Sequence, residues 1–221
     1  HLSGQSTIDA VDKKKNSYIK NNFTSTQILI KILKKLNIEN FVFSSTAAVY
    51  DKRNQIFKEN SKLNSNNIYG ISKIKCEKEI IDQLKNTNIR YCILRFFNVS
   101  GSFKKYKIGE FHSPETHLIP IIINSIINNK TIKIYGDNYK TSDGTCLRDY
   151  VHIKDIMSAI KKAIEFNEKK NFESEIFNLG SGKCYSILEI LKTCKNFSKK
   201  NIKTKFVRKR KYDVPFLRCD I

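Results

Sequence analysis

The stretch 16–46, NSYIKNNFTSTQILIKILKKLNIENFVFSST, decides the fold class of this chain. Its apolar residues recur at helical spacing, which predicts an amphipathic helix over 16–36 that ends at Asn37. Phe41-Val42-Phe43 follows as a short, unbroken apolar run, and such a run is typical of a strand buried on both faces of a sheet. A helix that leads straight into a buried strand indicates a parallel sheet covered by helices.

The same alternation continues to the end of the chain. After a polar loop over 51–67, the pattern predicts helices at 69–85, 118–128, 153–166 and 186–194, and strands at 91–97, 131–135, 176–179 and 202–207. The sequence therefore predicts the α/β class, with a doubly wound, Rossmann-like parallel sheet.

Composition excludes several classes of protein. The 221 residues carry a formal net charge of +20 and 40% of them are hydrophobic, which favours a folded domain over a disordered chain. The longest apolar stretch, 118–127, is interrupted by Pro120 and Asn124 and is too short to cross a bilayer, so we expect no membrane partner. Basic residues are dense only over 199–211, with Phe206 as the single aromatic residue, which indicates a solvated edge and no nucleic-acid partner.

The cysteines and histidines predict no metal site. The six cysteines form no C-x-x-C pair, so free thiols in a reducing compartment, the cytoplasm, are the simplest interpretation. His1, His112, His117 and His152 are scattered without the spacing of zinc ligands.

The glycines include one apparent phosphate-binding turn, Gly180-Ser181-Gly182-Lys183. It matches neither a Walker loop nor a dinucleotide turn, because Phe177, Cys184 and Tyr185 occupy positions where those motifs need Gly, Ser or Thr. We interpret it as an ordinary turn after a strand. The chain contains no G-x-G-x-x-G and opens on His1, so we expect it to begin inside a longer protein.

Tyr69-Gly70-Ile71-Ser72-Lys73 is the strongest catalytic candidate. On a helix, Tyr69 and Lys73 share a face, and an ammonium near a phenol lowers the phenol pKa from about 10 towards the range of a base. Ser44-Ser45-Thr46 follows the preceding strand, where parallel sheets place reactive groups. The alternative for 44–46 is a helix cap or turn, for which Ala47-Ala48-Val49 is a poor sequence.

Further motifs stand in order along the chain. They are Phe43-Ser44-Ser45-Thr46-Ala47-Ala48-Val49-Tyr50, Tyr69-Gly70-x-Ser72-Lys73, Leu94-Arg95-Phe96-Phe97-Asn98-Val99-x-Gly101, Thr116-His117-Leu118-Ile119-Pro120, Ile134-Tyr135-Gly136-Asp137, Asp143-Gly144-Thr145-x-x-Arg148-Asp149-Tyr150-Val151-His152 and Asn178-Leu179-Gly180-x-Gly182. In sequence and spacing they resemble the extended short-chain dehydrogenase/reductases that act on nucleotide sugars, and most closely the UDP-glucose 4-epimerase family.

The resemblance implies a domain organisation. Residues 1–100 would be the C-terminal part of an NAD-binding Rossmann domain whose N-terminal part is missing. Residues 101–221 would form mainly a smaller UDP-sugar-binding lobe, with 131–180 returning strands to the sheet. It also implies a homodimer, with NAD as the cofactor and a UDP-sugar as the substrate.

The resemblance further implies roles for individual residues. The catalytic residues would be Tyr69, Lys73 and Thr46. The cofactor-binding residues would be Leu2, Ser3, Gly4, Asn21, Ser44, Ser45, Tyr69, Lys73 and Phe97. The substrate-binding residues would be Thr46, Asn98, His117, Leu118, Lys133, Ile134, Tyr135, Arg148, Arg210, Asp213 and Leu217.

The implied reaction is the NAD-dependent interconversion of UDP-glucose and UDP-galactose, an isomerase activity of galactose metabolism. Tyr69 would take the proton of the sugar 4-hydroxyl while the hydride leaves C4 for NAD+, and the 4-keto sugar would turn and be reduced on its other face. Because the chain lacks the glycine turn that binds a dinucleotide, we expect residues 1–221 alone to be inactive.

Other interpretations stay open. A nucleotide-sugar dehydratase or decarboxylase needs a carboxylate after the Thr, where this chain has Ala47 and Ala48, and a non-catalytic nucleotide-sugar-binding fragment is the other alternative. The chain departs from the family at Arg210-Lys211-Tyr212-Asp213, where R-E-G-D is usual, and at His117, where many members have Asn. Leu217 is intermediate in bulk at the position that sets the sugar, so N-acetylated and pentose sugars stay possible.

Overall fold

The computed structural model describes residues 1–6, 15–51, 56–110, 112–168, 173–210 and 213–221. The chain divides into two compact units. Unit 1 comprises His1–Phe97 and Lys154–Leu179, and unit 2 comprises Asn98–Ile153 and Gly180–Ile221. We describe each unit by itself.

Unit 1 is built on a parallel sheet of three strands. They are β1 (Asn40–Thr46), β3 (Arg90–Phe96) and β7 (Glu175–Leu179), in the order β1-β3-β7. β3 runs parallel to both neighbours, with Phe43 opposite Ile93 and Ile93 opposite Ile176. The two-residue strand β2 (Ile56–Phe57) lies within the loop predicted over 51–67.

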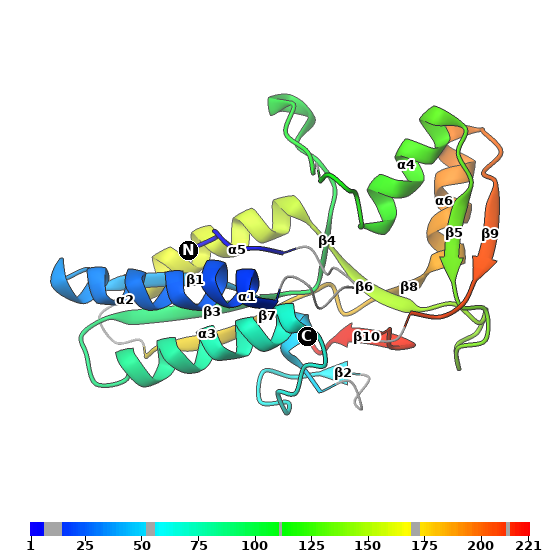
Figure 1. Cartoon of the computed structure of the whole chain (residues 1–221). Coiled ribbons are helices and arrows are strands. Elements are labelled where there is room, and N and C mark those ends of the chain that lie inside the picture. Colours follow the sequence, from blue (N-terminus) through cyan, green and yellow to red (C-terminus); the bar gives the residue numbers. More distant parts are fainter. Residues whose placement is uncertain (7–14, 52–55, 111, 169–172, 211–212) are drawn as a thin grey trace. The chain divides into compact units, whose positions relative to one another are not determined.

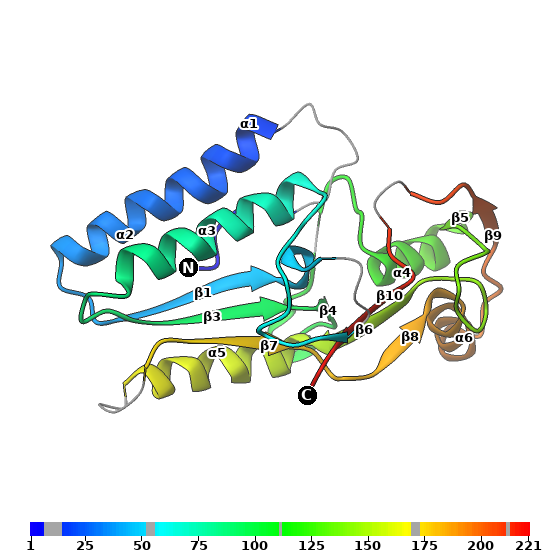
Figure 2. The ribbon, with the colours of Figure 1, turned by 90° about the horizontal axis from the view of Figure 1, so that it is seen from below.

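Helices cover both faces of this sheet (Figure 2). α2 (Ser25–Lys35) and α3 (Ile68–Leu84) lie on one face, and α5 (Ile153–Asn167) lies on the other. Alternate strand residues serve the two cores: Phe43 and Ile93 pack with α2 and α3, whereas Cys92 and Leu94 pack with Ala163 of α5. This arrangement confirms the predicted doubly wound parallel sheet.

The helix predicted over 16–36 contains an irregular turn. It consists of α1 (Lys15–Tyr18), the π-helical segment η2 (Ile19–Thr24) and α2. A π-helical turn holds more residues than an α-helical one and is often found at functional sites. Asn22 lies in this turn and is only 2% exposed, so a polar side chain enters the core where helical periodicity alone predicts none.

Unit 2 contains two further groups of strands (Figure 1). The central strand β6 (Leu147–His152) is parallel to β4 (Asn98–Ser100) and β10 (Phe216–Cys219) and antiparallel to β8 (Cys184–Ser186). β5 (Ile132–Tyr135) pairs in parallel with β9 (Thr204–Val207), next to α4 (Leu118–Asn128) and α6 (Ile187–Ser198). Ile122 of α4, Ile132 and Ile134 of β5 and Leu191 of α6 form the buried core there. Unit 2 also contains the short 3-10 helix η4 (Lys104–Tyr106), and a similar one in unit 1, η3 (Ala47–Val49), directly follows β1.

The strands of unit 2 differ from the prediction. We expected 131–180 to return strands to the main sheet, yet among the described residues of this stretch only β7 pairs there, while β5 and β6 pair within unit 2. β4, β6, β8 and β10 were not predicted, because they are short or carry polar residues such as Arg148 and Asp149 that break an apolar run.

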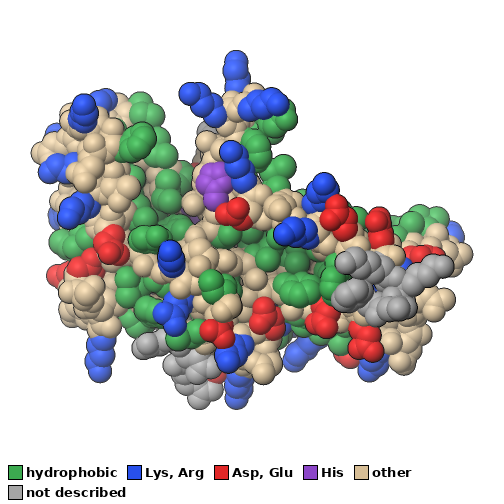
Figure 3. Space-filling view, turned by 180° about the vertical axis from the view of Figure 1, so that it is seen from behind, with side chains coloured by type: hydrophobic (Ala, Val, Ile, Leu, Met, Phe, Trp, Pro, Cys, Tyr) green, Lys and Arg blue, Asp and Glu red, His purple; other side chains and the backbone are tan. Residues whose placement is uncertain are grey.

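Surface and cysteine chemistry agree with the composition. On the face drawn in Figure 3, Lys and Arg side chains are spread over the surface with Asp and Glu among them. No helix in the described part of the chain combines the length and the apolar content that a membrane span requires. All six cysteines are free thiols.

Candidate functional site

A close backbone contact fixes the start of α3. The Asn67 side chain caps the helix by accepting a hydrogen bond from the Gly70 amide at 2.7 Å. A Cβ atom on Gly70 would lie 2.1 Å from Ser65 Oγ and 2.4 Å from the Ala48 carbonyl oxygen, so this position requires glycine. The first turn of α3, with Tyr69, is therefore held against the turn that follows β1.

Thr46 and Tyr69 meet at this contact. The Thr46 hydroxyl accepts a hydrogen bond from the Ala48 amide at 3.2 Å and thereby caps η3. The Thr46 side chain is also close enough to Tyr69 to lower the pKa of the phenol. From the sequence we expected Ala47–Val49 to form a turn poorly. This expectation was wrong, because the Thr46 cap stabilises a 3-10 turn there. The cap alternative therefore holds for Thr46, and its role in a catalytic site stays a prediction.

The Tyr69 phenol is more weakly acidic than the sequence predicts. Burial raises the pKa of Tyr69 to about 12, although the Thr46 side chain acts in the opposite direction. We expected Lys73 to lower this pKa, and the structure has the opposite shift. In the chain alone, Tyr69 is therefore neutral at pH 7.

Lys73 is held at the carboxyl end of β1. Its ammonium donates a hydrogen bond to the Ser44 carbonyl oxygen at 2.8 Å and lies 4.6 Å from the centre of the Phe43 ring. The residue is 5% exposed, and this burial lowers the pKa of Lys73. The positive charge of Lys73 therefore lies at the carboxyl end of β1, where the sequence analysis placed the candidate residues Ser44-Ser45-Thr46.

The first residues of the chain run along the open edge of β1. The His1 amino group donates to the Val42 carbonyl at 2.7 Å, and the His1 carbonyl accepts from the Ser44 amide at 3.2 Å. The next three residues, Leu2, Ser3 and Gly4, are exposed. All three are predicted to bind the cofactor. They lie where a strand beside β1 would end.

Asn22 and Asn21 occupy different environments near Gly4. The Asn22 amide oxygen accepts a hydrogen bond from the Gln5 amide at 2.7 Å, and its nitrogen donates to Ser72 Oγ at 2.9 Å. Asn21, the predicted cofactor residue, is exposed and lines a hollow of about 530 Å³ together with Gly4. Asn22 was missed, because only the π-helical turn brings it inward.

Ser45 and Phe97, like Ser44 and Lys73, are predicted cofactor residues that are buried. The Ser45 hydroxyl donates to the Glu77 carboxylate in the core. Phe97 is 6% exposed, and its amide donates to the Leu179 carbonyl at 3.0 Å. Ser45 therefore supports the strand end from inside, through a carboxylate that the sequence did not reveal.

In unit 2, Arg148, Asp213 and Leu217 come together. An Arg148 Nη atom lies 3.7 Å from an Asp213 carboxylate oxygen, and the guanidinium also donates to the carbonyls of Leu147 and Val214 at 2.9 and 2.8 Å. Arg148 stands opposite Leu217 where β6 and β10 pair. These contacts bring three of the predicted substrate residues together.

Tyr135 and Arg210 form a second pair, with the guanidinium 3.9 Å from the centre of the ring. Of the two neighbours predicted with Tyr135, Lys133 is exposed, whereas the Ile134 side chain is 1% exposed and packs in the core. Ile134 therefore has only its backbone to offer a ligand. Lys211 and Tyr212 lie outside the described residues.

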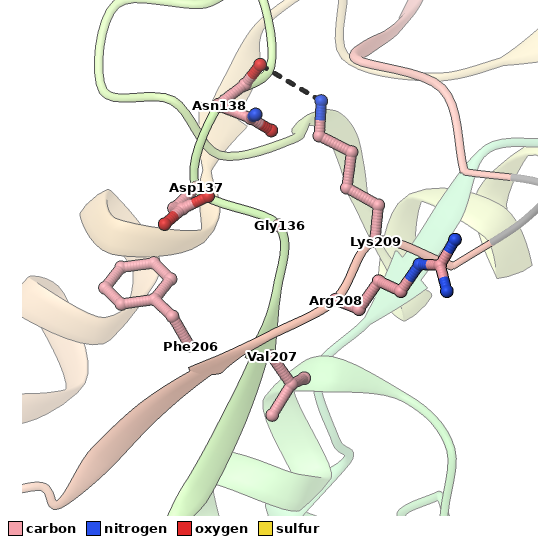
Figure 4. A pocket seen from close by; sticks show the side chains of 7 residues that line it. All are labelled: Gly136, Asp137, Asn138, Phe206, Val207, Arg208 and Lys209. Carbon is pink, nitrogen blue, oxygen red and sulfur yellow. Dashed lines mark hydrogen bonds between the residues drawn. The ribbon is translucent and has the colours of Figure 1, made fainter.

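A hollow of about 470 Å³ lies where β5 and β9 end (Figure 4). It is lined by Gly136, Asp137, Asn138, Phe206, Val207, Arg208 and Lys209. The Lys209 ammonium turns to the Asn138 carbonyl, to which it donates at 3.0 Å, and the Arg208 side chain extends away from Asp137. The sequence analysis quoted Gly136 and Asp137 in a motif and Phe206 in the basic stretch, but it assigned none of the seven residues to a site.

The remaining predicted residues of unit 2 lie at separate places. The side-chain amide of Asn98 donates a hydrogen bond to the backbone carbonyl of Asp149 at 3.0 Å. His117 and Leu118 stand at the start of α4. His117 also contacts His112 and Glu110, so the sequence-based view that the histidines are scattered was wrong for this pair. A loop, rather than a helical or C-x-x-C spacing, brings them together.

An internal carboxylate occupies the glycine turn. Asp149 is fully buried and accepts hydrogen bonds from the Ser181 amide at 2.7 Å and the Gly182 amide at 3.0 Å. It also accepts from the Ser181 hydroxyl and from the Cys219 amide. These amides are therefore not free for a phosphate, which confirms the interpretation of the motif as an ordinary turn.

Comparison with known proteins places these motifs in a family. The model of the NAD dependent epimerase/dehydratase family matches residues 1–180. The chain is 34% identical over 96% of its length to "UDP-glucose 4-epimerase" of Halalkalibacterium halodurans, of which it covers 64%.

Two solved structures are similar over nearly the whole chain. The structure of UDP-glucose 4-epimerase from Brucella ovis in complex with NAD has a TM-score of 0.93 at 31% identity, over 100% of this chain and 68% of that one. The Bifidobacterium longum enzyme in complex with NAD+ and UDP has a TM-score of 0.90 at 29% identity, over 98% of this chain and 66% of that one. The chain thus spans about 64% of the curated relative's length and belongs to the NAD dependent epimerase/dehydratase family.

Proposed function

We propose that the protein containing this chain interconverts UDP-glucose and UDP-galactose by inverting the configuration at carbon 4 of the sugar. The grouping of Thr46, Tyr69 and Lys73 at the carboxyl end of β1 carries the proposal. The 34% identity to a UDP-glucose 4-epimerase supports it.

The residues of unit 1 fit part of a dinucleotide. A Cβ on Gly4 would lie 2.9 Å from Asn22 Oδ1 and 3.8 Å from Lys73 Nζ, so the glycine lets the backbone approach Asn22 and the lysine ammonium closely. We assign Lys73, Ser44 and the edge at 2–4 to holding the cofactor ribose and nicotinamide. When bound, NAD supplies the acceptor and donor of hydride for carbon 4.

Tyr69 and Thr46 have complementary roles in this proposal. Tyr69 takes the proton from the 4-hydroxyl and returns it, while Thr46 orients the same hydroxyl. Because the pKa of Tyr69 is about 12 in the chain alone, its action as a base requires that positive charge be added beside the phenol when the cofactor binds. Lys73 contributes a second, fixed positive charge on the same helix face.

Unit 2 is assigned to the UDP group. Arg148 and Arg210 carry planar guanidinium forks that suit diphosphate oxygens. Arg148 is fixed by the carbonyls of Leu147 and Val214, and Arg210 by the Tyr135 ring, so both are oriented before a ligand arrives. The bound UDP in the Bifidobacterium longum structure supports this assignment.

We also propose a homodimer. Ile28 and Ile32 of α2 and its C-cap residue Leu36 lie four residues apart and are 54%, 45% and 62% exposed. An apolar stripe of this kind favours contact with another protein surface. Sedimentation analysis of the parent protein and of an Ile28→Lys/Ile32→Lys variant tests it: the parent should sediment as a dimer and the variant as a monomer.

The test of the reaction is an epimerase assay on the whole protein with UDP-glucose, UDP-galactose and UDP-N-acetylglucosamine. Tyr69→Phe should abolish nearly all turnover while UDP binding stays close to normal, and Tyr91→Phe, at the opposite end of the sheet, should keep its activity. A near-parental rate for Tyr69→Phe would refute the assignment. A dehydrated product instead would favour the dehydratase alternative, for which Ala47 and Ala48 supply no acid.

A further inference from the structure

Four side chains converge in the loop between η4 and α4. Glu110 Oε1 lies 3.1 Å from His112 Nε2 and 2.7 Å from His117 Nδ1. On the other side, Glu115 Oε1 lies 3.2 Å from the same His117 Nδ1. The donor atoms of Glu110, His112 and His117 all lie within 4.8 Å of one another. The two imidazole rings are 5.0 Å apart between centres and inclined by 46°.

Protons leave the Glu110 side of this cluster poorly satisfied. His117 Nδ1 carries at most one proton, yet two carboxylate oxygens lie within 3.2 Å of it. Of these two oxygens, Glu115 Oε1 also accepts hydrogen bonds from the amides of Thr116 and His117 at 2.8 Å. Within the described part of the chain, the ion-pair partners of both carboxylates are these histidines and no Lys or Arg. This is unusual in a chain of net charge +20, where basic partners are abundant. A divalent cation would balance both carboxylates and accept both imidazole lone pairs.

We propose that Glu110, His112 and His117 bind a divalent transition-metal ion of the Zn²⁺ class, with a fourth position open to water or to the neighbouring Glu115. Two imidazole nitrogens with a carboxylate oxygen favour such an ion over Mg²⁺ or Ca²⁺, which select oxygen donors. With metal–ligand bonds of about 2.0–2.2 Å, neighbouring donors of a tetrahedral site stand about 3.3 Å apart, close to the spacing seen here. The side chains are 16–43% exposed, so an ion can enter from solvent.

Such an ion would join the two ends of the segment 110–117. Because His117 is the residue directly before α4, the metal would fix the approach of this segment to the helix. His117 Nδ1 faces the cluster, so Nε2 stays available for another partner. The proposal does not depend on the epimerase assignment.

The test is calorimetric titration of the chelator-treated protein with ZnCl₂. We expect one ion per chain, and no comparable binding of MgCl₂. His112→Asn and Glu110→Gln should each weaken Zn²⁺ binding by roughly 10–100-fold. His152→Asn is the matched control, because it removes another exposed histidine of unit 2 and should leave the affinity unchanged.

Two results would overturn the proposal. One is a parental Zn²⁺ affinity in both His112→Asn and Glu110→Gln, with circular dichroism showing that the variants are folded. The other is a thiolate charge-transfer band when Co²⁺ replaces Zn²⁺, because that band would assign the ion to the free cysteines. Should one variant fail to fold, the other decides.

Discussion

Glu77 and Arg95 form a buried, two-point ion pair in the core of unit 1. Arg95 Nη2 lies 2.7 Å from Glu77 Oε2, and Arg95 Nε donates to Glu77 Oε1 at 3.1 Å, with the two side chains 2% and 1% exposed. Glu77 also accepts from the Ser45 hydroxyl, one residue before Thr46. The pair therefore joins α3 to β3, and through the Ser45 hydroxyl it also holds the carboxyl end of β1.

Glu77→Gln should reduce the free energy of unfolding by about 3–5 kcal/mol, because it leaves the buried Arg95 charge without its partner. Urea unfolding of the parent and the variant measures this. Asp82→Asn is the matched control on the same helix: Asp82 is 70% exposed and 3.7 Å from Lys85, and its loss should cost less than about 1 kcal/mol. Equal losses in the two variants would contradict the role given to the pair.

Tyr69 should make stability fall at high pH. The pKa of Tyr69 is raised from 10.0 to about 12 in the folded chain, so folding is favoured below pH 10 and this contribution is lost as pH rises towards 12. The expected slope is up to about 1.4 kcal/mol per pH unit. Urea unfolding between pH 9 and 11 should show a shallower fall for Tyr69→Phe than for the parent. The exposed Tyr106→Phe should keep the parental slope.

Lys73→Met should remove most activity and move the pH optimum of the remaining activity upward. The reason is that Tyr69 loses a positive neighbour, so its phenolate forms only at higher pH. A pH–rate profile of each variant measures the shift. Lys78→Met, exposed on the same helix, should keep the parental profile. An unshifted optimum in Lys73→Met would show that its bond to the Ser44 carbonyl is purely structural.

Much of unit 1 could be predicted from the sequence, because its strands are continuous apolar runs and its helices have apolar residues at helical spacing. Phe41–Phe43 and 91–97 were recognised as buried strands, although Arg95 within the second was taken as part of an apolar run. Burial of Arg95 depends on Glu77, which lies 18 residues earlier on a helix, and no local pattern reveals such a pairing. The same holds for Asn22, which a π-helical turn directs inward.

Unit 2 was predicted less well, because several of its strands are short or carry polar residues and so form no continuous apolar run. β6 contains Arg148 and Asp149 side by side, and β10 and β8 pair with it through segments distant in sequence. The resemblance implied that Arg148, Asp213 and Leu217 bind the substrate. The structure adds that Arg148 lies 3.7 Å from Asp213 and stands opposite Leu217 in the sheet. The resemblance did not imply the cluster around His117, because that cluster depends on loop geometry.

Arg148→Ala should weaken UDP binding by about 2–5 kcal/mol, the cost of leaving a desolvated phosphate oxygen without its charged partner. Calorimetry with UDP measures it. Arg90→Ala is a well-matched control, because Arg90 is 21% exposed and 3.7 Å from Glu39, against 17% and 3.7 Å from Asp213 for Arg148. If both variants bind UDP as the parent does, Arg148 only ties β6 to the carbonyl of Val214.

Asp149→Asn tests whether the buried carboxylate organises the strand pairing of unit 2. Asp149 Oδ1 accepts from the Ser181 amide and hydroxyl, while Oδ2 accepts from the amides of Gly182 and Cys219, both at 3.0 Å. An amide nitrogen in place of Oδ2 would face two further donors. We expect the free energy of unfolding to fall by at least about 2 kcal/mol, because these buried amides lose their acceptor.

Hydrogen exchange locates the effect of this substitution. The amides of Gly182 and Cys219 should exchange much faster in Asp149→Asn, whereas those of β1 and β3, which exchange through global unfolding, should exchange faster only by the factor that the loss of unfolding free energy sets. Asp155→Asn, exposed at the start of α5, is the control and should change stability by no more than about 1 kcal/mol. Since Cys219 lies two residues after Leu217 on β10, loosening its amide should also weaken UDP binding through Arg148, the residue opposite Leu217. Parental exchange at Gly182 and Cys219 would mean that the β6–β10 pairing holds without the carboxylate.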